Sequence, residues 1–254
     1  MSRPPLSVQP LSPRDARRRR LVLAALGLPP LAGVAGCGGG HDDRPADPLL
    51  RFVNGTRDVT LASFYVDDLF ATSLNLGGIG SIYGELSRAT HTVSVRQGGN
   101  ELERVQLAFF GDSATTILAY GSTAPGGDVR FWVVAEDSAR PAPGQVRLRA
   151  FHAAVHRPQP LAVHVGAAGA PLGTPTFTLD AYETRSGFVE VRAGTYRVRV
   201  TPAGAPDDLL LDYPAALLPA DTVWHLAVVP RAAGSDRVNI AAIRERGDGQ
   251  TWTA

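Results

Sequence analysis

The stretch LSRATHTVSV at residues 86–95 aligns without a gap on VRAGTYRVRV at residues 191–200. Both stretches end in a run where every second residue is apolar or aromatic, the pattern of a β-strand with one buried face. A match 105 residues apart (191 minus 86) indicates a duplicated domain and not a short solenoid repeat. The sequence therefore predicts two copies of one all-β unit.

Further matches extend the repeat in both directions. Their separations grow from 98 residues (148 minus 50) to 108 residues (225 minus 117), which small loop insertions explain. The matching pairs are Leu50-Arg51 with Leu148-Arg149, Tyr65-Val66 with His164-Val165, and Ile117–Tyr120 with His225–Val228. Because Arg51 and Arg149 occupy matching places, we interpret both as side chains on a solvated strand face.

Short runs rich in β-branched and aromatic residues fill the chain from residue 49 onward, without a convincing helical repeat. In the first copy, the expected strands cover residues 59–66, 90–96, 103–110, 115–120 and 129–134. Glycine-rich turn clusters lie between some of them. The leucine pairs of residues 206–220 are compatible with a helical turn. We expect an all-β fold of two tandem immunoglobulin-like β-sandwich domains.

Composition divides the chain into five segments. A basic and then apolar leader precedes a polar tether rich in glycine and proline, and a polar, proline-rich linker separates the two copies. The expected segments are a signal peptide (1–36), a cysteine and tether (37–48), a first domain (49–137), a linker (138–144) and a second domain (145–254).

Cys37 is the only cysteine, which excludes an internal disulfide and every multi-cysteine metal site. Four arginines at residues 17–20 precede an apolar run at residues 21–36, which is shorter than the roughly 20 residues needed to span a bilayer. Such a run is typical of a signal peptide. Val34-Ala35-Gly36-Cys37 resembles the lipobox of bacterial lipoproteins, so we expect cleavage before Cys37 and a lipid on its thiol.

The expected location is the cell envelope, with the protein anchored by several acyl chains, since two or more chains give stable anchoring. Gly38 stands where an aspartate would retain a Gram-negative lipoprotein at the inner membrane. The outer membrane is therefore favoured, with the protein facing the periplasm or the exterior. Arg18-Arg19 also resembles part of a twin-arginine signal, and the export route stays open.

The net charge of +1 hides an uneven distribution. Residues 1–36 carry six arginines and one aspartate, which leaves 19 basic (25 minus 6) and 23 acidic (24 minus 1) side chains in residues 37–254. A body that carries more acidic than basic groups is a poor partner for phosphate backbones. No nucleic-acid partner is expected.

The second copy resembles the domain-of-unknown-function 4397 family of bacterial envelope proteins. In that family a His-Ala-Ser-Pro-Asp-Ala-Pro segment precedes a Val-Asp-Val-Tyr-Val strand, and residues 152–158 (HAAVHRP) and 161–165 (LAVHV) stand in their place. The family's Ser-Gly-Tyr stretch and Ala-Gly-Thr-Tyr hairpin correspond to residues 186–188 (SGF) and 193–196 (AGTY). The resemblance covers about residues 49–243, is weaker in the first copy, and implies a fold but no activity.

Residues of the expected hairpin have structural roles. We expect Gly194 at a tight turn with a positive φ, where a side chain would clash. Tyr196 is expected in the core together with Val198 and Val200, which leaves Arg199 on the wetter face of the strand.

Motifs for catalysis are sparse. Gly111-Asp112-Ser113 resembles the nucleophile block of the Gly-Asp-Ser-Leu hydrolases, with Ala114 in place of the leucine. Asp221 and His225 lie four residues apart, and not three as in that family. No P-loop or dinucleotide-binding motif is present. A hydrolase that uses Ser113 with His225 therefore stands only as an alternative.

Three histidines are weak candidates for metal ligands. His152 and His156 are four residues apart, and His164 would approach from the next strand, which gives a zinc site of three histidines at best. Pro158 and Pro160 disfavour the helix that would place the first two on one face. We expect no metal and no cofactor, and the three-histidine zinc site stays an alternative.

Together these features favour a non-enzymatic, lipid-anchored envelope protein with a binding or structural role. One expected partner is the membrane, through the lipid on Cys37. The other is an envelope or extracellular ligand, protein or glycan, held by loops at one end of a sandwich.

Cys37→Ala removes the only thiol that can carry the lipid. We expect the variant to incorporate no labelled fatty acid and to keep its signal peptide, because the lipoprotein peptidase acts on the modified cysteine. Metabolic labelling with radioactive palmitate, followed by electrophoresis, measures both. Incorporation of label by the variant would contradict the anchor assignment.

Overall fold

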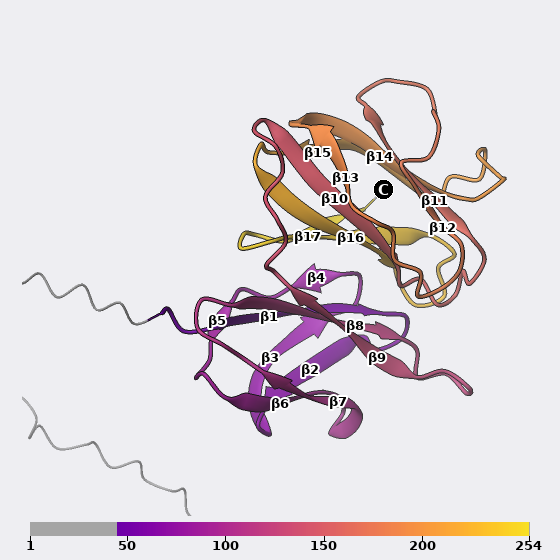
Figure 1. Cartoon of the computed structure of the whole chain (residues 1–254). Coiled ribbons are helices and arrows are strands. Elements are labelled where there is room, and N and C mark those ends of the chain that lie inside the picture. The colour runs from indigo at the N-terminus through magenta and orange to yellow at the C-terminus, as the bar shows by residue number, and fades with distance from the viewer. Residues whose placement is uncertain (1–44, 254) are drawn as a thin grey trace, which may run out of the picture. The chain divides into compact units, whose positions relative to one another are not determined.

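The computed structural model describes residues 45–253. All of the secondary-structure elements among these residues are β-strands (Figure 1). The first half consists of β1 (Leu49–Thr56), β2 (Leu61–Val66), β3 (Leu69–Asn75), β4 (Ile79–Gly80), β5 (Gly84–Glu85), β6 (Thr90–Gln97), β7 (Asn100–Ala108), β8 (Ala114–Gly121) and β9 (Val129–Ala135). The second half consists of β10 (Gln145–His152), β11 (Leu161–Ala167), β12 (Phe177–Leu179), β13 (Val189–Arg192), β14 (Gly194–Pro202), β15 (Leu211–Leu218), β16 (Thr222–Pro230), β17 (Val238–Arg244) and β18 (Gln250–Trp252). No helix in the described part of the chain is long and apolar enough to cross a membrane.

Each half forms two sheets with a matching strand order. In the first half, the inner sheet has the order β4-β1-β8-β9, with β5 also paired to β1, and the outer sheet has the order β3-β2-β6-β7. The second half has the inner order β13-β10-β16-β17-β18 and the outer order β12-β11-β14-β15. In both inner sheets two neighbouring strands are parallel, β1 with β8 and β10 with β16. The expected all-β sandwich class is confirmed, and the immunoglobulin-like subtype stays a prediction.

The two stretches that reveal the repeat occupy equivalent strands of the outer sheets. Val93 and Val95 of β6 are fully buried, and so are Val198 and Val200 of β14. β6 lies between β2 and β7, as β14 lies between β11 and β15. A slip of one residue in either strand would take these valines out of the cores of the two halves, so packing fixes the register.

Central strands of the inner sheets are buried on both faces. All eight residues of β8 are buried, as are seven of the eight residues of β1 and eight of the nine residues of β16. A strand that is covered on two sides shows a nearly continuous apolar run and not an alternating one. The second cover of each inner sheet comes from the other half of the fold.

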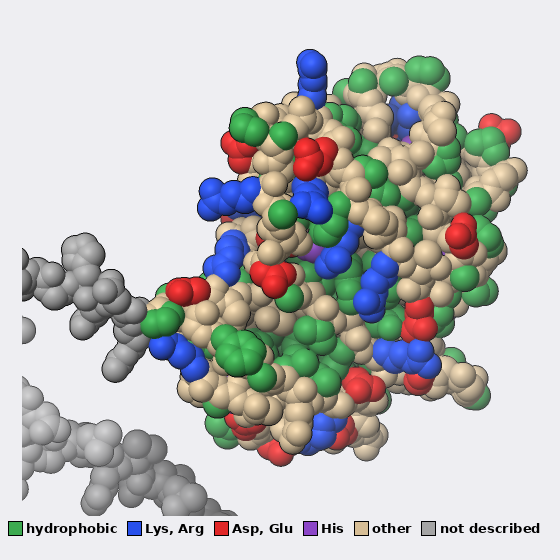
Figure 2. All heavy atoms as spheres, in the orientation of Figure 1, with side chains coloured by type: hydrophobic (Ala, Val, Ile, Leu, Met, Phe, Trp, Pro, Cys, Tyr) green, Lys and Arg blue, Asp and Glu red, His purple; other side chains and the backbone are tan. Residues whose placement is uncertain are grey.

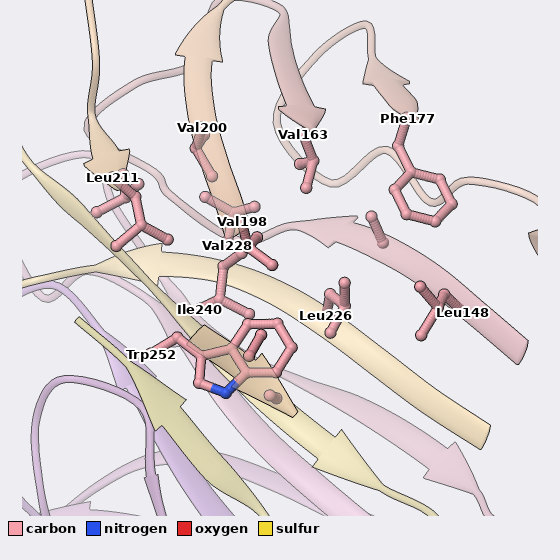
Figure 3. Close-up of a cluster of buried hydrophobic side chains, with 14 of the residues drawn as sticks. Leu148, Val163, Phe177, Val198, Val200, Leu211, Leu226, Val228, Ile240 and Trp252 are labelled. Atoms are coloured by element: carbon pink, nitrogen blue, oxygen red, sulfur yellow. The ribbon is translucent and has the colours of Figure 1, made fainter. Parts of the chain in front are cut away.

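Three clusters of buried side chains fill the spaces between the four sheets. The first-half core includes Phe52, Phe64 and Ile117. In the second-half core, side chains of β11 and β14 face those of β10, β16 and β17 (Figure 3). The third cluster, here called the shared core, takes residues from both halves: Val53, Leu118, Tyr120, Trp132, Val134, Phe151, Ala153, Ala227, Val229, Ala241 and Ile243.

Aromatic rings form the centre of the shared core. The ring centroid of Phe151 lies 4.4 Å from that of Trp132 and 5.2 Å from that of Tyr120, both in the first half. The close approach of the sheets also requires Gly55, because a Cβ there would lie 2.7 Å from Cγ1 of Val229. The two inner sheets therefore pack directly against each other.

Several expectations about single residues are wrong. Arg51 is 3% exposed, because the second half covers its side of β1, and Arg149 is half-buried. Gly194 has no positive φ, because it begins a strand. Arg199 is buried and donates hydrogen bonds to two loop carbonyls at 3.2 and 2.9 Å. Residues 206–220 contain β15 and no helical turn.

The shared core predicts a single unfolding transition for the two halves. Phe151→Ala removes a fully buried ring from it, at a typical cost of roughly 3–5 kcal/mol, and should separate the melting of the halves. Phe177→Ala, the matched control, removes a ring from the second-half core alone and should lower the transition without splitting it. Differential scanning calorimetry distinguishes these outcomes. Two transitions in the unmodified protein would contradict a shared core.

Candidate functional site

The predicted lipid site, Cys37, and the tether up to residue 44 lie outside the described residues. The described chain begins at the edge of the first half. The Leu86 amide donates a hydrogen bond to the Pro48 carbonyl at 2.9 Å, and β1 pairs with β5 directly afterwards. The residues that lead into β1 therefore lie beside Leu86 and Arg88 on one side and Asp112 on the other.

The structure does not bring the three candidate zinc ligands together. His152 and His164 each have a ring nitrogen close to a loop carbonyl oxygen, at 3.2 and 2.9 Å. Burial, with a smaller contribution from the nearby Arg57, lowers the pKa of His156 to about 4. Within residues 45–253, no group of three or more His, Cys, Asp or Glu side chains is placed to hold a metal ion.

Ser113 and His225 have separate partners. The Ser113 hydroxyl donates to the Phe110 carbonyl at 2.6 Å. His225 is fully buried in β16, where its two ring nitrogens contact Arg149 and Glu245. The serine and histidine that the hydrolase alternative requires are therefore not hydrogen-bonded to each other.

A cavity of about 610 Å³, here called the edge pocket, opens at one edge of the first half. It lies between β3, the edge strand of the outer sheet, and residues 81–87, which follow the edge of the inner sheet. Most of its larger lining side chains are apolar: Leu50, Phe52, Val66, Leu69, Phe70, Ile82 and Leu86. Its volume falls within the range of about 300–1,000 Å³ that is typical of small-molecule sites.

Large apolar side chains stand exposed at the mouth of the edge pocket. The exposed fractions of Leu69, Phe70 and Ile82 are 74%, 62% and 90%. Single exposed apolar residues are common, but a group of them around one opening marks an interaction site. These residues were not predicted from the sequence. The adjacent apolar pair Leu69-Phe70 breaks the alternation of apolar and polar residues in a strand, and this break could have indicated an exposed apolar side chain.

The edge pocket is open because the two halves differ at one matched position. Phe64 and Val163 hold matching places in the repeat, and their cross-strand partners are Thr72 and Phe177. The Phe177 side chain is buried in the second-half core. Thr72 is smaller and lines the edge pocket instead, so the first half keeps a space that the second half fills.

An ion pair lies at the polar end of the edge pocket. Nδ1 of His91 lies 2.5 Å from Oδ2 of Asp67, and the Thr92 amide donates to Oδ1 at 2.8 Å. The hydrogen bond with Asp67 raises the pKa of His91. The same bond lowers the pKa of Asp67. Both shifts favour an imidazolium beside a carboxylate.

Ser87 completes a Ser–His–Asp group whose geometry differs from that of a hydrolase. Nε2 of His91 lies 3.0 Å from the Ser87 carbonyl oxygen and 3.1 Å from its hydroxyl. A carbonyl oxygen only accepts, so Nε2 carries a proton and does not act as a base toward the hydroxyl. Tyr196, at the matching place of the second copy, likewise donates to the carbonyl four residues earlier, that of Arg192, at 2.7 Å. We interpret His91 as a side chain that fastens the preceding loop.

Arg51 belongs to a buried polar network between the halves. Its Nε donates to the Thr116 hydroxyl at 2.6 Å, and its guanidinium lies 3.2 Å from the Glu136 carboxylate. It also donates to the Arg244 carbonyl of the second half at 2.6 Å. Tyr83 donates to the other carboxylate oxygen of Glu136 at 2.5 Å. The buried charges are paired, as burial requires, and a structural role accounts for them.

Asp67→Asn removes the carboxylate that raises the pKa of His91. We expect the pKa of His91 to fall toward its ordinary value near 6.5, because the hydrogen bond with Asp67 is the main cause of the shift. An NMR titration of the His91 ring protons measures this change. Asp68→Asn is the matched control, because Asp68 pairs with Arg96 and Arg104. An unchanged His91 pKa in Asp67→Asn would rule out the ion pair.

The same pair sets a pH window for stability. The raised pKa of His91 stabilises the fold fully below the ordinary value near 6.5, and this effect is lost as the pH rises through the raised value. The lowered pKa of Asp67 stabilises the fold above the ordinary value near 3.8, and this effect is lost as the pH falls through the lowered value. Between these ordinary values both effects are present, and Asp67→Asn should flatten this pH dependence of the free energy of unfolding.

Residues 48–165 match the model of a protein family described as a domain of unknown function (DUF4397). The matched segment covers the first half and continues through β10 into β11. Residues 186–188 and 193–196, which carry part of the family resemblance, lie beyond the match, and a second domain of the family stays a prediction. No curated protein matches the chain. Residues 48–165 therefore belong to the DUF4397 family.

Proposed function

We propose that this chain is a non-enzymatic, lipid-anchored protein of the cell envelope that holds a fatty-acyl chain in its edge pocket. The observation that carries the proposal is the edge pocket itself, a cavity of about 610 Å³ with mostly apolar walls. Burial of hydrocarbon in such a space is favourable by about 25 cal/mol for each Å² removed from water. The exposed apolar side chains around the mouth extend the same surface outward.

The polar groups of the edge pocket favour hydrocarbon over a glycan. The Tyr83 hydroxyl donates to Glu136, and both ring nitrogens of His91 have partners within the fold. A sugar needs several open donors and acceptors, because each buried hydroxyl without a partner carries a desolvation cost. A hydrocarbon chain makes no such demand.

The attachment point of the tether supports the membrane part of the proposal. Eight residue steps (45 minus 37) separate Cys37 from Pro45, the first described residue, a distance of at most about 26–29 Å. The residues that lead into β1 lie beside Leu86, which also lines the edge pocket. A lipid on Cys37 would therefore keep this edge of the first half close to the bilayer.

The hydrogen bonding of the candidate catalytic side chains supports a non-enzymatic role. Nε2 of His91 faces a carbonyl oxygen and therefore carries a proton. Ser113 and His225 each have other partners. Binding needs none of these groups to react.

Thr72→Phe gives the first half the ring that Phe177 supplies in the second half, and should fill the edge pocket. In the unlipidated Cys37→Ala background, a fluorescent long-chain fatty acid is expected to bind saturably. Adding Thr72→Phe should weaken that binding by at least about tenfold, because the ring displaces the buried acyl chain. Thr178→Phe, at an exposed position of β12, is the matched control and should bind as the background does.

Fluorescence titrations of the three proteins decide between the outcomes. The proposal fails if the Cys37→Ala background shows no saturable binding, or if Thr72→Phe binds equally well. The lipidated protein then identifies the source of the acyl chain. If it does not take up the fluorescent acid, its own lipid fills the edge pocket; if it does, the edge pocket is filled from outside.

A further inference from the structure

The two inner sheets place an arginine and a glutamate in matching registers, with one different residue between them. In the first half, Arg51 pairs with Thr116 across β1 and β8. Thr116 pairs with Val134 of β9, and Glu136 follows two residues later. The arginine and the carboxylate thus lie on either side of the central threonine.

The second half repeats this register with a histidine in the centre. Arg149 pairs with His225 across β10 and β16. His225 pairs with Ile243 of β17, and Glu245 follows two residues later. Among these three polar positions, the central one is therefore the only one at which the residue type differs between the halves.

The histidine changes what the carboxylate binds. In the first half, the short threonine lets the guanidinium of Arg51 reach Glu136 directly, at 3.2 Å. In the second half, Nδ1 of His225 accepts a hydrogen bond from Nε of Arg149 at 2.5 Å, and Nε2 donates to Glu245 at 2.7 Å. The Glu245 carboxylate is hydrogen-bonded to His225. The terminal nitrogens of Arg149 have no carboxylate partner among the described residues.

The protonation states of His225 and Glu245 leave the positive charge of Arg149 only partly compensated. Burial lowers the pKa of His225, which is therefore neutral. Burial alone would raise the pKa of Glu245, but its hydrogen bond with His225 helps to hold it below the usual value. Burial also lowers the pKa of Arg149; Glu245 and Asp137 oppose this shift, and the neighbouring Arg185 and Arg147 add to it.

Arg147 and Arg185 lie near Arg149, and all three guanidinium groups lie over aromatic rings. The guanidinium carbons of Arg147 and Arg149 lie 4.4 and 4.8 Å from the ring centroid of Phe188. Those of Arg149 and Arg185 each lie 5.7 Å from the ring centroid of Trp132, which belongs to the first half. Stacking of this kind orients a guanidinium and leaves the N–H groups at its edge free to donate. Figure 2 shows arginine side chains gathered on the face where β10 and β13 lie.

Among the described residues, no carboxylate forms an ion pair with Arg147, Arg149 or Arg185. Asp137 and Glu190 are both exposed. Glu190 is the cross-strand neighbour of Arg147, yet the two side chains form no ion pair in the described structure. One terminal nitrogen of Arg147 donates to the Ala139 carbonyl at 3.1 Å. The terminal nitrogens of Arg149 and Arg185 have no hydrogen-bond partner in the part of the chain that the structure describes, so they are open donors.

We propose that Arg147, Arg149 and Arg185 bind an oxyanion, a phosphate or carboxylate group, at the seam between the two halves. Guanidinium groups match both anions geometrically, and their charge-assisted hydrogen bonds are about twice as strong as neutral ones. The first half satisfies its arginine with an internal carboxylate, and the second half leaves the equivalent arginine for a ligand. This site is separate from the edge pocket and does not depend on it.

Titration of the Cys37→Ala chain with inorganic phosphate, at constant ionic strength, tests the site through the NMR signals of the arginine Nε–H groups. We expect saturable shifts for Arg149 and Arg185. Arg185→Gln removes an exposed guanidinium and should weaken phosphate binding by about tenfold or more, the usual effect of losing a charged hydrogen-bond partner. Arg231→Gln, an exposed arginine beyond the opposite end of the same sheet, is the matched control and should leave the affinity unchanged. Acetate in place of phosphate shows whether carboxylates bind as well.

His225→Thr gives the second half the central residue of the first half. Glu245 should then pair with Arg149, and phosphate affinity should fall although all three arginines remain. The absence of saturable shifts in the Cys37→Ala chain, or an equal affinity in Arg185→Gln, overturns the site. An unchanged affinity in a folded His225→Thr variant overturns the inference that the histidine keeps the carboxylate away from Arg149.

Discussion

Packing of one inner sheet against the other is the constraint on which the rest of the structure depends. It buries β1, β8 and β16 on both faces, so polar groups on these strands must find partners inside the fold. Arg51 meets this requirement through Glu136 and a carbonyl of the second half. The Phe151 ring, held between Trp132 and Tyr120, fills the centre of the same interface. Each half thus completes the burial of the other.

A scaffold of two halves with matching strand orders can differ locally through single changes at matched positions. Where the second half has Phe177, the first half has Thr72, and a cavity opens at its edge. Where the first half has Thr116, the second half has His225, and an arginine loses its internal carboxylate. Neither change alters the strand order, because the valines and leucines of the cores stay in place. In many scaffolds, fold alone does not specify function.

How well the sequence predicts a strand depends on whether that strand has one solvated face. Residues 90–96 belong to an outer sheet, and their alternation correctly places Val93 and Val95 in the core. Alternation fails for Arg51, because one of its hydrogen-bond partners is a backbone carbonyl of the second half, nearly 200 residues away in the sequence (244 minus 51). Gly194 was misplaced because the turn expected at this residue is a strand. The edge pocket could not be predicted, since it arises from a cross-strand pairing, Thr72 with Phe64, that periodicity does not reveal.

The measurement that tests the account most directly is the position of a bound acyl chain. An NMR experiment on the Cys37→Ala protein with carbon-13-labelled palmitate detects which protein protons lie beside the methylene groups. The account predicts contacts with the Thr72 methyl group, the Phe52 ring and Leu50, all of which line the edge pocket of the first half. Contacts confined to the second half, or bound palmitate without contacts to Thr72, would contradict it.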